Sequence, residues 1–196
     1  MVAEESLRER ILGHAIKLFA RKGFDATSLQ DIADAAGVTK GALYYYYASK
    51  DDLLFRIHER VVSYETTHAE EILARGMDPD STLQALIVDG VTSIGLFHEE
   101  VTVTLREMHR LQPEYFAKIS AIREKYQTVF ERVITQGQNQ GLFRLDIPPR
   151  MATLALLGMS NWMFAWFKPE GSVTPTEIGQ MFSLIFLQGM RLPALT

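Results

Sequence analysis

The side chains best suited to chemistry lie in one short stretch, residues 39–47, which begins with small and polar residues and ends with four tyrosines. Lys40 can donate to the O6 or N7 atom of guanine, or to a phosphate. Thr39, with a helix beginning beside it, would offer further donors to a phosphate oxygen. Gly41 has no side chain that would hold the backbone away from a base edge. These residue types at this spacing indicate recognition of double-stranded DNA.

The four tyrosines, Tyr44 to Tyr47, span one helical turn, so they cannot all point the same way. We expect one or two of them to pack inward and the others to reach a phosphate backbone. The alternative is an ordinary helical hairpin with an exposed aromatic cluster. Four consecutive tyrosines argue against it, because a surface without a partner rarely exposes such a patch.

Two short helices joined by a tight turn must position this stretch, as in a helix-turn-helix. Helical spacing of apolar residues predicts the first of the two, with members Leu29, Ile32, Ala33 and Ala36. Gly37 would end that helix, and Thr39 would cap the second one.

An earlier apolar stripe, from Leu7 to Phe19, predicts one more helix before this pair. The helix beginning near residue 29 would have a capping box, in which two residues satisfy each other's backbone N–H groups. Thr27 with Gln30, or Ser28 with Asp31, has the required spacing.

Phe24 to Lys50 resembles the DNA-binding signature of the TetR family. The resemblance implies an all-helical homodimer that represses transcription until an inducer binds, with Lys40 and Gly41 at base-contacting positions. The phosphate-contacting positions of the family fall on Thr39, Tyr44, Tyr45, Tyr46 and Lys50. Tyr46 stands where the family often has His, and Tyr47 where it often has Phe; both keep the implied roles of phosphate donor and core aromatic.

The predicted fold is therefore all-α, with an N-terminal three-helix helix-turn-helix domain over residues 1–52. Residues 53–196 are predicted to form a helical domain for ligand binding and dimerisation. The DNA-binding residues are predicted to be Ser28, Thr39, Lys40, Gly41, Tyr44, Tyr45, Tyr46 and Lys50. Apolar spacing and turn residues predict further helices at about 81–98, 101–111, 113–140, 150–167 and 176–191.

Two features of the C-terminal part point to a ligand. Positive charge gathers at Arg106, Arg110, Arg123 and Lys125, while large soft side chains gather at Met159, Trp162, Met163 and Trp166. Soft side chains line adaptable apolar pockets, and arginines bind phosphate or carboxylate. Together they suggest an amphipathic anion. A solvated basic face, with aromatics in the core or a dimer interface, is the alternative.

Residues 157–171 also resemble a TetR subgroup that responds to acyl-CoA thioesters of fatty-acid or steroid-ring degradation. The resemblance implies an acyl-CoA inducer, with a neutral hydrophobic effector of the drug-efflux type as the alternative. The predicted ligand-binding residues are Arg106, Arg110, Arg123, Met159, Trp162, Met163 and Trp166. A last apolar stripe would form the dimer and place two recognition helices on a palindromic operator; it comprises Ile178, Met181, Phe182, Ile185 and Gly189.

Composition narrows the class of protein. The chain has 196 residues, 47% of them hydrophobic, a net charge of −4 and no cysteine. The five histidines are scattered without metal-binding or triad spacing, so we expect no catalytic residue, metal or cofactor. No segment reads as a signal peptide or membrane span, and we expect a cytoplasmic protein without a membrane partner. A helical adaptor that does not bind DNA remains the other non-enzymatic alternative.

Overall fold

The computed structural model describes residues 6–192, and in that range every regular element is a helix, apart from one isolated backbone bridge. The all-α prediction is confirmed. The chain forms two compact units: the first contains the chain up to Val61 together with Glu99–Ile119, and the second contains Val62–His98 and the chain from Ser120 onward. The predicted functional boundary after residue 52 falls inside a helix and stays a prediction.

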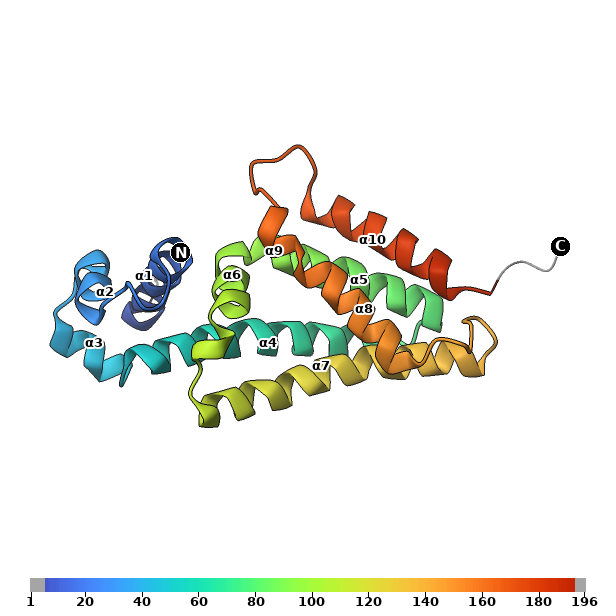
Figure 1. Cartoon of the computed structure of the whole chain (residues 1–196), viewed down its shortest axis with the longest axis horizontal. Helices are drawn as coiled ribbons and strands as arrows, with labels where there is room; N and C mark the ends of the chain where they lie inside the picture. Colours follow the sequence, from blue (N-terminus) through green and yellow to red (C-terminus); the bar gives the residue numbers. More distant parts are fainter. Residues whose placement is uncertain (1–5, 193–196) are drawn as a thin grey trace. The chain divides into compact units, whose positions relative to one another are not determined.

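The first unit holds the helix-turn-helix (Figure 1). Its elements are α1 (Leu7–Lys22), α2 (Leu29–Ala36), α3 (Lys40–Tyr46), the first half of α4 (Lys50–Ala74), nearly all of α6 (His98–Arg106), the short 3-10 helix η1 (Met108–Arg110) and the start of α7 (Pro113–Asn139). Apolar side chains from α1, α2, α3 and α4 form its core; among them Ile11, Ile32, Leu43 and Leu53 are fully buried.

The turn between α2 and α3 follows from local sequence. Of the two possible capping boxes, Ser28 with Asp31 is the one formed: the Ser28 hydroxyl accepts from the Asp31 N–H at 3.0 Å, and the Asp31 carboxylate accepts from the Ser28 N–H at 2.8 Å. Gly37 ends α2 in the left-handed region, with φ of +66°. Thr39 then caps α3 by accepting from the Ala42 N–H at 3.1 Å. Each cap is worth about 1 kcal/mol.

His58 joins α4 to α6 inside the first unit. Its ring is fully buried, with Nδ1 at 2.9 Å from the Leu54 carbonyl and Nε2 at 3.1 Å from the Thr104 carbonyl. One of these contacts is to the preceding turn of its own helix, and the other crosses to α6. The side chain therefore links two helices of this unit that are far apart in sequence.

The second unit is a helical bundle (Figure 1). Its elements are the second half of α4, α5 (Pro79–Leu96), the remainder of α7, α8 (Pro149–Asn161), α9 (Met163–Trp166) and α10 (Pro175–Met190). Helix α10 runs along α5 at close range. A Cβ atom on Gly179 would lie only 3.0 Å from the Cα of Val88, so α10 approaches α5 where a side chain is missing.

Two predicted helices differ from the observed ones. The helix predicted at about 150–167 is broken at Trp162 into α8 and α9, and the one predicted at about 101–111 ends at Arg106 and continues as η1. Neither break has a glycine or proline at it, and the apolar spacing continues through both. The breaks therefore carry no signal that helical periodicity could detect.

Candidate nucleic-acid interface and effector pocket

The predicted base-contacting residues stand at the exposed start of α3. Thr39, Lys40 and Gly41 are all exposed. The ammonium of Lys40 lies 5.9 Å from the ring centroid of Tyr44, one helical turn later. Tyr44 and Tyr45 are 48% and 83% exposed, which is unusual for side chains of this size. Helix α3 therefore presents a cation, small residues and two accessible tyrosines together.

The other two tyrosines are more enclosed. Tyr46 is half-buried and meets Tyr45 edge-to-face, with ring centroids 5.0 Å apart. Tyr47 is buried, and its hydroxyl donates to the Arg8 carbonyl at 3.1 Å, which anchors α3 on α1. Burial also raises the pKa of Tyr47. The expectation that one or two tyrosines pack inward is confirmed.

Lys50 has a structural task that the sequence pattern did not reveal. Its Nζ atom donates to the carbonyls of Phe24 and Thr27, at 2.8 and 3.0 Å, and lies 4.2 Å from the centroid of the Phe24 ring. An ammonium has three donors, so one remains for a phosphate. The predicted phosphate contact of Lys50 stays a prediction, as does that of Ser28, whose hydroxyl donates to Asp31 at 2.7 Å.

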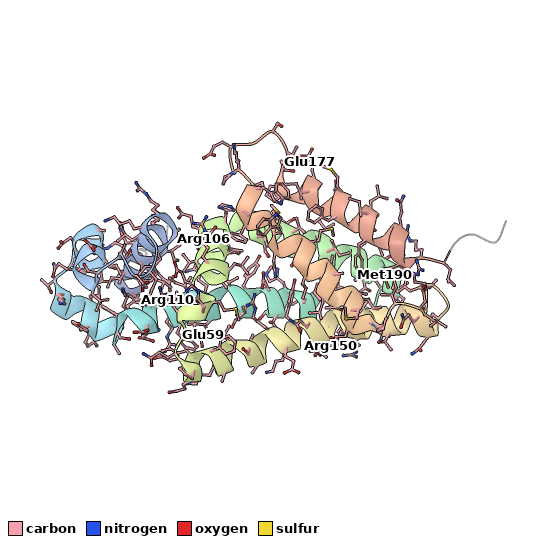
Figure 2. The ribbon with its side chains drawn as sticks, in the orientation of Figure 1. Glu59, Arg106, Arg110, Arg150, Glu177 and Met190 are labelled. Carbon is pink, nitrogen blue, oxygen red and sulfur yellow. The ribbon has the colours of Figure 1, made fainter. Side chains whose placement is uncertain are left out.

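The three arginines predicted to bind a ligand do not share a unit. Arg106 and Arg110 are exposed in the first unit, at the end of α6 and in η1 (Figure 2). Arg110 forms an ion pair with Asp25. Arg123 belongs to α7 in the second unit, where burial lowers its pKa and the charge of Glu65 opposes that effect.

The predicted apolar ligand residues also occupy different environments. Met163 is fully buried and Met159 is half-buried, whereas Trp162 and Trp166 are 64% and 46% exposed. The two indoles are therefore on the surface of the second unit, a place that suits a dimer interface as well as a ligand. Their role stays a prediction.

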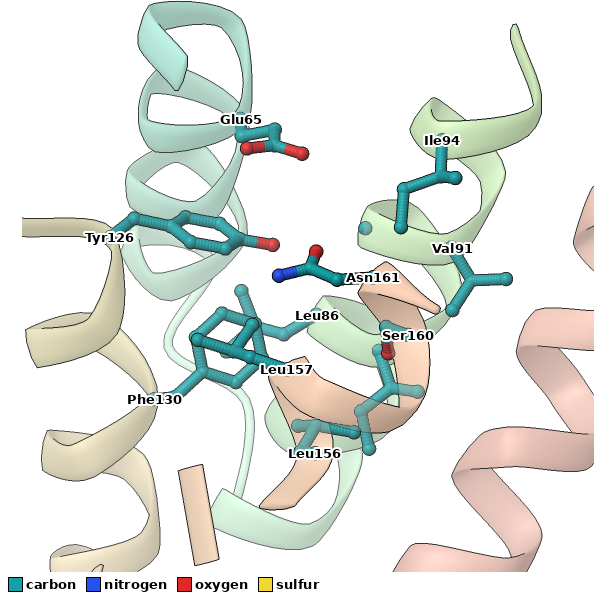
Figure 3. A pocket seen from close by; sticks show the side chains of 12 residues that line it. Glu65, Leu86, Val91, Ile94, Tyr126, Phe130, Leu156, Leu157, Ser160 and Asn161 are labelled. Atoms are coloured by element: carbon teal, nitrogen blue, oxygen red, sulfur yellow. The ribbon is translucent and has the colours of Figure 1, made fainter. Parts of the chain in front are cut away.

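A pocket with about 300 Å³ of empty volume lies inside the second unit, between α4, α5, α7 and α8 (Figure 3). Its wall is mostly aliphatic and aromatic. The lining residues are Glu65, Leu86, Ile87, Gly90, Val91, Ile94, Tyr126, Phe130, Leu156, Leu157, Ser160 and Asn161. None of these described lining residues is an arginine or a lysine.

Three polar side chains face into this space: the Glu65 carboxylate, the Tyr126 hydroxyl and the Asn161 amide (Figure 3). Desolvation raises the pKa of Glu65 to about 7, against a smaller opposing effect of the charge on Arg123. Burial raises the pKa of Tyr126 well above its ordinary value, so its hydroxyl stays protonated at neutral pH. A Cβ on Gly90 would lie 2.8 Å from the Tyr126 hydroxyl, which explains the glycine beside it.

The sequence analysis overlooked these pocket residues, although a signal existed. Glu65 occupies a position of the α4 stripe whose other members, Val62, Ala69 and Ile72, are buried. An acidic residue at an apolar position of a helix is a candidate for function, because burying a charge is costly unless something compensates it.

Two searches of residues 6–192 gave negative findings. No helix there is both long and apolar enough to cross a membrane. No group of three or more His, Asp or Glu side chains in the same range is placed to hold a metal ion.

Comparison with known proteins gave consistent results. Residues 11–57 match the bacterial regulatory proteins of the tetR family, and residues 76–190 match the tetracyclin repressor-like C-terminal domain. The HTH-type transcriptional repressor KstR2 of Rhodococcus jostii (strain RHA1) is 31% identical over 187 residues, covering 95% of this chain and 92% of KstR2.

Solved structures agree with these matches. The ketosteroid transcriptional regulator KstR2 of Mycobacterium tuberculosis has a TM-score of 0.89 at 27% identity, covering 97% of each chain. The structure of AibR in complex with isovaleryl coenzyme A and operator DNA has a TM-score of 0.80 at 30% identity, covering 93% of this chain and 99% of that chain.

These relatives are transcriptional regulators rather than enzymes. Regulators of this type bind operator DNA, dimerise and respond to a small-molecule effector, and they do not carry a cofactor. The chain therefore belongs to the TetR family of bacterial regulatory proteins and is a ligand-responsive, DNA-binding transcriptional repressor.

Proposed function

We propose that this repressor is released from a palindromic operator by an acyl-CoA thioester of lipid or steroid catabolism. The observation that carries the proposal is the apolar pocket of the second unit in a chain 30% identical to AibR, whose structure contains isovaleryl coenzyme A and operator DNA. The likeness to KstR2, a ketosteroid transcriptional regulator, supports the same chemical class. The protein would act in the cytoplasm.

On DNA, the start of α3 would enter the major groove. Lys40 would donate to a base edge and Gly41 would allow close approach, while Thr39, Tyr44, Tyr45 and Tyr46 would contact phosphates. The exposure of this face supports the assignment. Phosphate contacts would give affinity and register, and the base contact would give sequence preference. Ser28 and Lys50 would add phosphate contacts beside the face.

For the ligand, an acyl group would occupy the pocket, with Met159, Trp162, Met163 and Trp166 as further apolar contacts. The anionic head would meet Arg123 and other cations among Arg106, Arg110 and Lys125, because charge-assisted hydrogen bonds to phosphate are strong. Release of DNA would require that the thioester favour the conformation that misfits the operator.

A neutral hydrophobic effector is a second candidate, and one specific observation favours it. The described lining of the pocket contains no cation, and its ionisable group, Glu65, would repel a nearby anion once deprotonated. A neutral molecule with a polar substituent would avoid that repulsion. Which of the two classes releases the operator is a matter of direct titration.

Titration of the protein–operator complex tests the proposal. Acyl-CoA esters from short-chain to steroid-sized should release the operator, whereas the free acids and CoA alone should not. Trp166→Ala should weaken release while leaving ligand-free DNA binding nearly intact, with Trp162→Ala as a matched variant at the neighbouring exposed indole. If no ester in the panel releases the operator while neutral apolar compounds do, the second candidate replaces the first.

A further inference from the structure

Polar groups inside the pocket lack partners from the protein. Among residues 6–192, no hydrogen bond or ion pair satisfies the Glu65 carboxylate, the Tyr126 hydroxyl or the Asn161 amide. Buried polar groups in folded proteins nearly always have a hydrogen-bond partner, because leaving one unsatisfied costs free energy. Three such groups facing one apolar space therefore indicate a ligand that brings its own polar atom.

The three groups restrict what that polar atom can be. Tyr126 is protonated at neutral pH and offers a donor, and the Asn161 amide offers a donor and an acceptor. The Glu65 carboxylate, when ionised, only accepts. A ketone would accept from Tyr126 but leave Glu65 unsatisfied. An ammonium could pair with Glu65, but the positive charge of Arg123 acts on the same carboxylate and would oppose a second cation.

A hydroxyl group satisfies both sides at once, since it donates through its hydrogen and accepts through its oxygen. We propose that the pocket recognises an alcohol: a compact apolar body whose hydroxyl donates to Glu65 and accepts from Tyr126, with Asn161 beside them. A volume near 300 Å³ is at the small end of ligand sites and suits one or two fused rings or a short branched chain.

This inference deepens the proposed function and rests on it only in taking the pocket as the effector site. It concerns the part of the effector inside the pocket, and it holds whether that part is an acyl group of a thioester or a free neutral molecule. A test that uses small probes without CoA therefore separates the two proposals.

Calorimetric titration of the full-length protein with three probes of one shape provides the test: 2-decalol, 2-decalone and 2-aminodecalin. The alcohol should bind about fivefold more tightly than the ketone, because it makes one more hydrogen bond. It should also bind more tightly than the amine. Equal affinities, or a preference for the ketone or the amine, would overturn the assignment of an alcohol.

Two variants locate the preference. Glu65→Leu should abolish the difference between alcohol and ketone, while Tyr126→Phe should weaken both by about fivefold, since each accepts from that hydroxyl. Tyr64→Phe removes a hydroxyl from the same unit outside the lining and serves as the matched control. Tyr126→Phe removes a single oxygen from an ordered helix, so it gives an answer even if Glu65→Leu disturbs folding. An alcohol preference unchanged in both folded variants would refute the site.

The operator assay then distinguishes the two failures. If the alcohol preference is present and depends on Glu65, but no CoA thioester releases the operator, the acyl-CoA proposal fails and the pocket inference stands. If thioesters release the operator but the probes show no alcohol preference, the pocket inference fails alone.

Discussion

The backbone N–H of Phe24 donates to the Glu107 carboxylate at 3.2 Å, and this bond ties the loop before α2 to the residue that follows α6. The loop is held a second time, because Arg110 forms an ion pair with Asp25. Both contacts lie within the first unit. Residues 107–110 therefore help to fix the loop that leads into the helix-turn-helix.

Removing the Glu107 carboxylate should destabilise the protein. In Glu107→Ala the part-buried N–H of Phe24 loses its acceptor, which should lower the free energy of unfolding by about 1–2 kcal/mol. Glu107→Gln keeps an oxygen acceptor and should retain most of the stability. Urea denaturation measures both. Glu114→Ala, which removes an exposed carboxylate paired with Lys118, is the control and should change stability little.

Exposed residues of α3 should divide into two classes in gel-shift experiments at one fixed salt concentration. Lys40→Ala should weaken operator binding by about 1–3 kcal/mol and relax base preference. Tyr46→Phe should weaken binding to all sequences similarly, since only a phosphate contact is lost. Lys168→Ala removes an exposed cation of the second unit and should leave binding unchanged. Wild-type affinity in both α3 variants would remove this face from the interface.

Lys50 allows a sharper distinction, because a phosphate contact and a structural clamp make different predictions. Lys50→Met keeps the length of the side chain but leaves the carbonyls of Phe24 and Thr27 without their donor. We expect the variant to lose about 1–3 kcal/mol of unfolding free energy as well as operator affinity. Lys22→Met, at an exposed lysine of α1, is the control. A variant with wild-type stability and weaker DNA binding would show that Lys50 acts on phosphate alone.

Much of the helix-turn-helix could be predicted because its signals are local. Ser28, Gly37 and Thr39 are capping and turn residues whose roles depend on neighbours a few positions away, and each is found in its predicted place. The function of Lys50 was not visible in the same way. Its partners, Phe24 and Thr27, are more than twenty positions earlier, and only the fold brings them together.

The second unit shows the limit of pattern more clearly. The apolar stripe on α10 was predicted as one dimer surface, but Ile178 is buried within the unit, while Met181 and Ile185 are 49% and 61% exposed. Periodicity reports which residues are apolar and does not separate a core contact from an interface. For the same reason, the exposed Trp162 and the buried Met163 looked alike in sequence.

The exposed apolar residues of α10 lead to a prediction about assembly. Met181, Leu184 and Ile185 form an accessible strip, and Ile185→Glu would bury an unpaired charge if that strip is the dimer interface. The variant should be a monomer by light scattering at micromolar concentration, where the unmutated protein should be a dimer. Gln84→Glu adds the same charge to an exposed position of α5 and should not split the dimer. A dimeric Ile185→Glu variant would place the interface elsewhere.

The Glu65 carboxyl should make stability depend on pH near neutrality. Its pKa is about 7 in the folded protein, above the ordinary 4.5, because desolvation outweighs the attraction of Arg123, and Asp89 raises it further. The folded state therefore keeps a proton between these two values that the unfolded state has lost. The stabilising contribution is complete below pH 4.5 and disappears as the pH rises through 7.

Glu65→Gln lacks this titration, so the comparison with the wild type isolates it. The free energy of unfolding of the wild type, minus that of Glu65→Gln, should fall by on the order of 2 kcal/mol between about pH 5 and about pH 8. Urea denaturation at a series of pH values measures the difference, and other titrating groups cancel because both proteins share them. In Glu114→Gln the altered carboxyl is exposed and its pKa is lowered by Lys118, so that difference should stay flat over the same range. If the wild type and Glu65→Gln instead give parallel curves, the carboxyl is ionised in the folded protein throughout, and the pocket is wetter and more polar than its lining suggests.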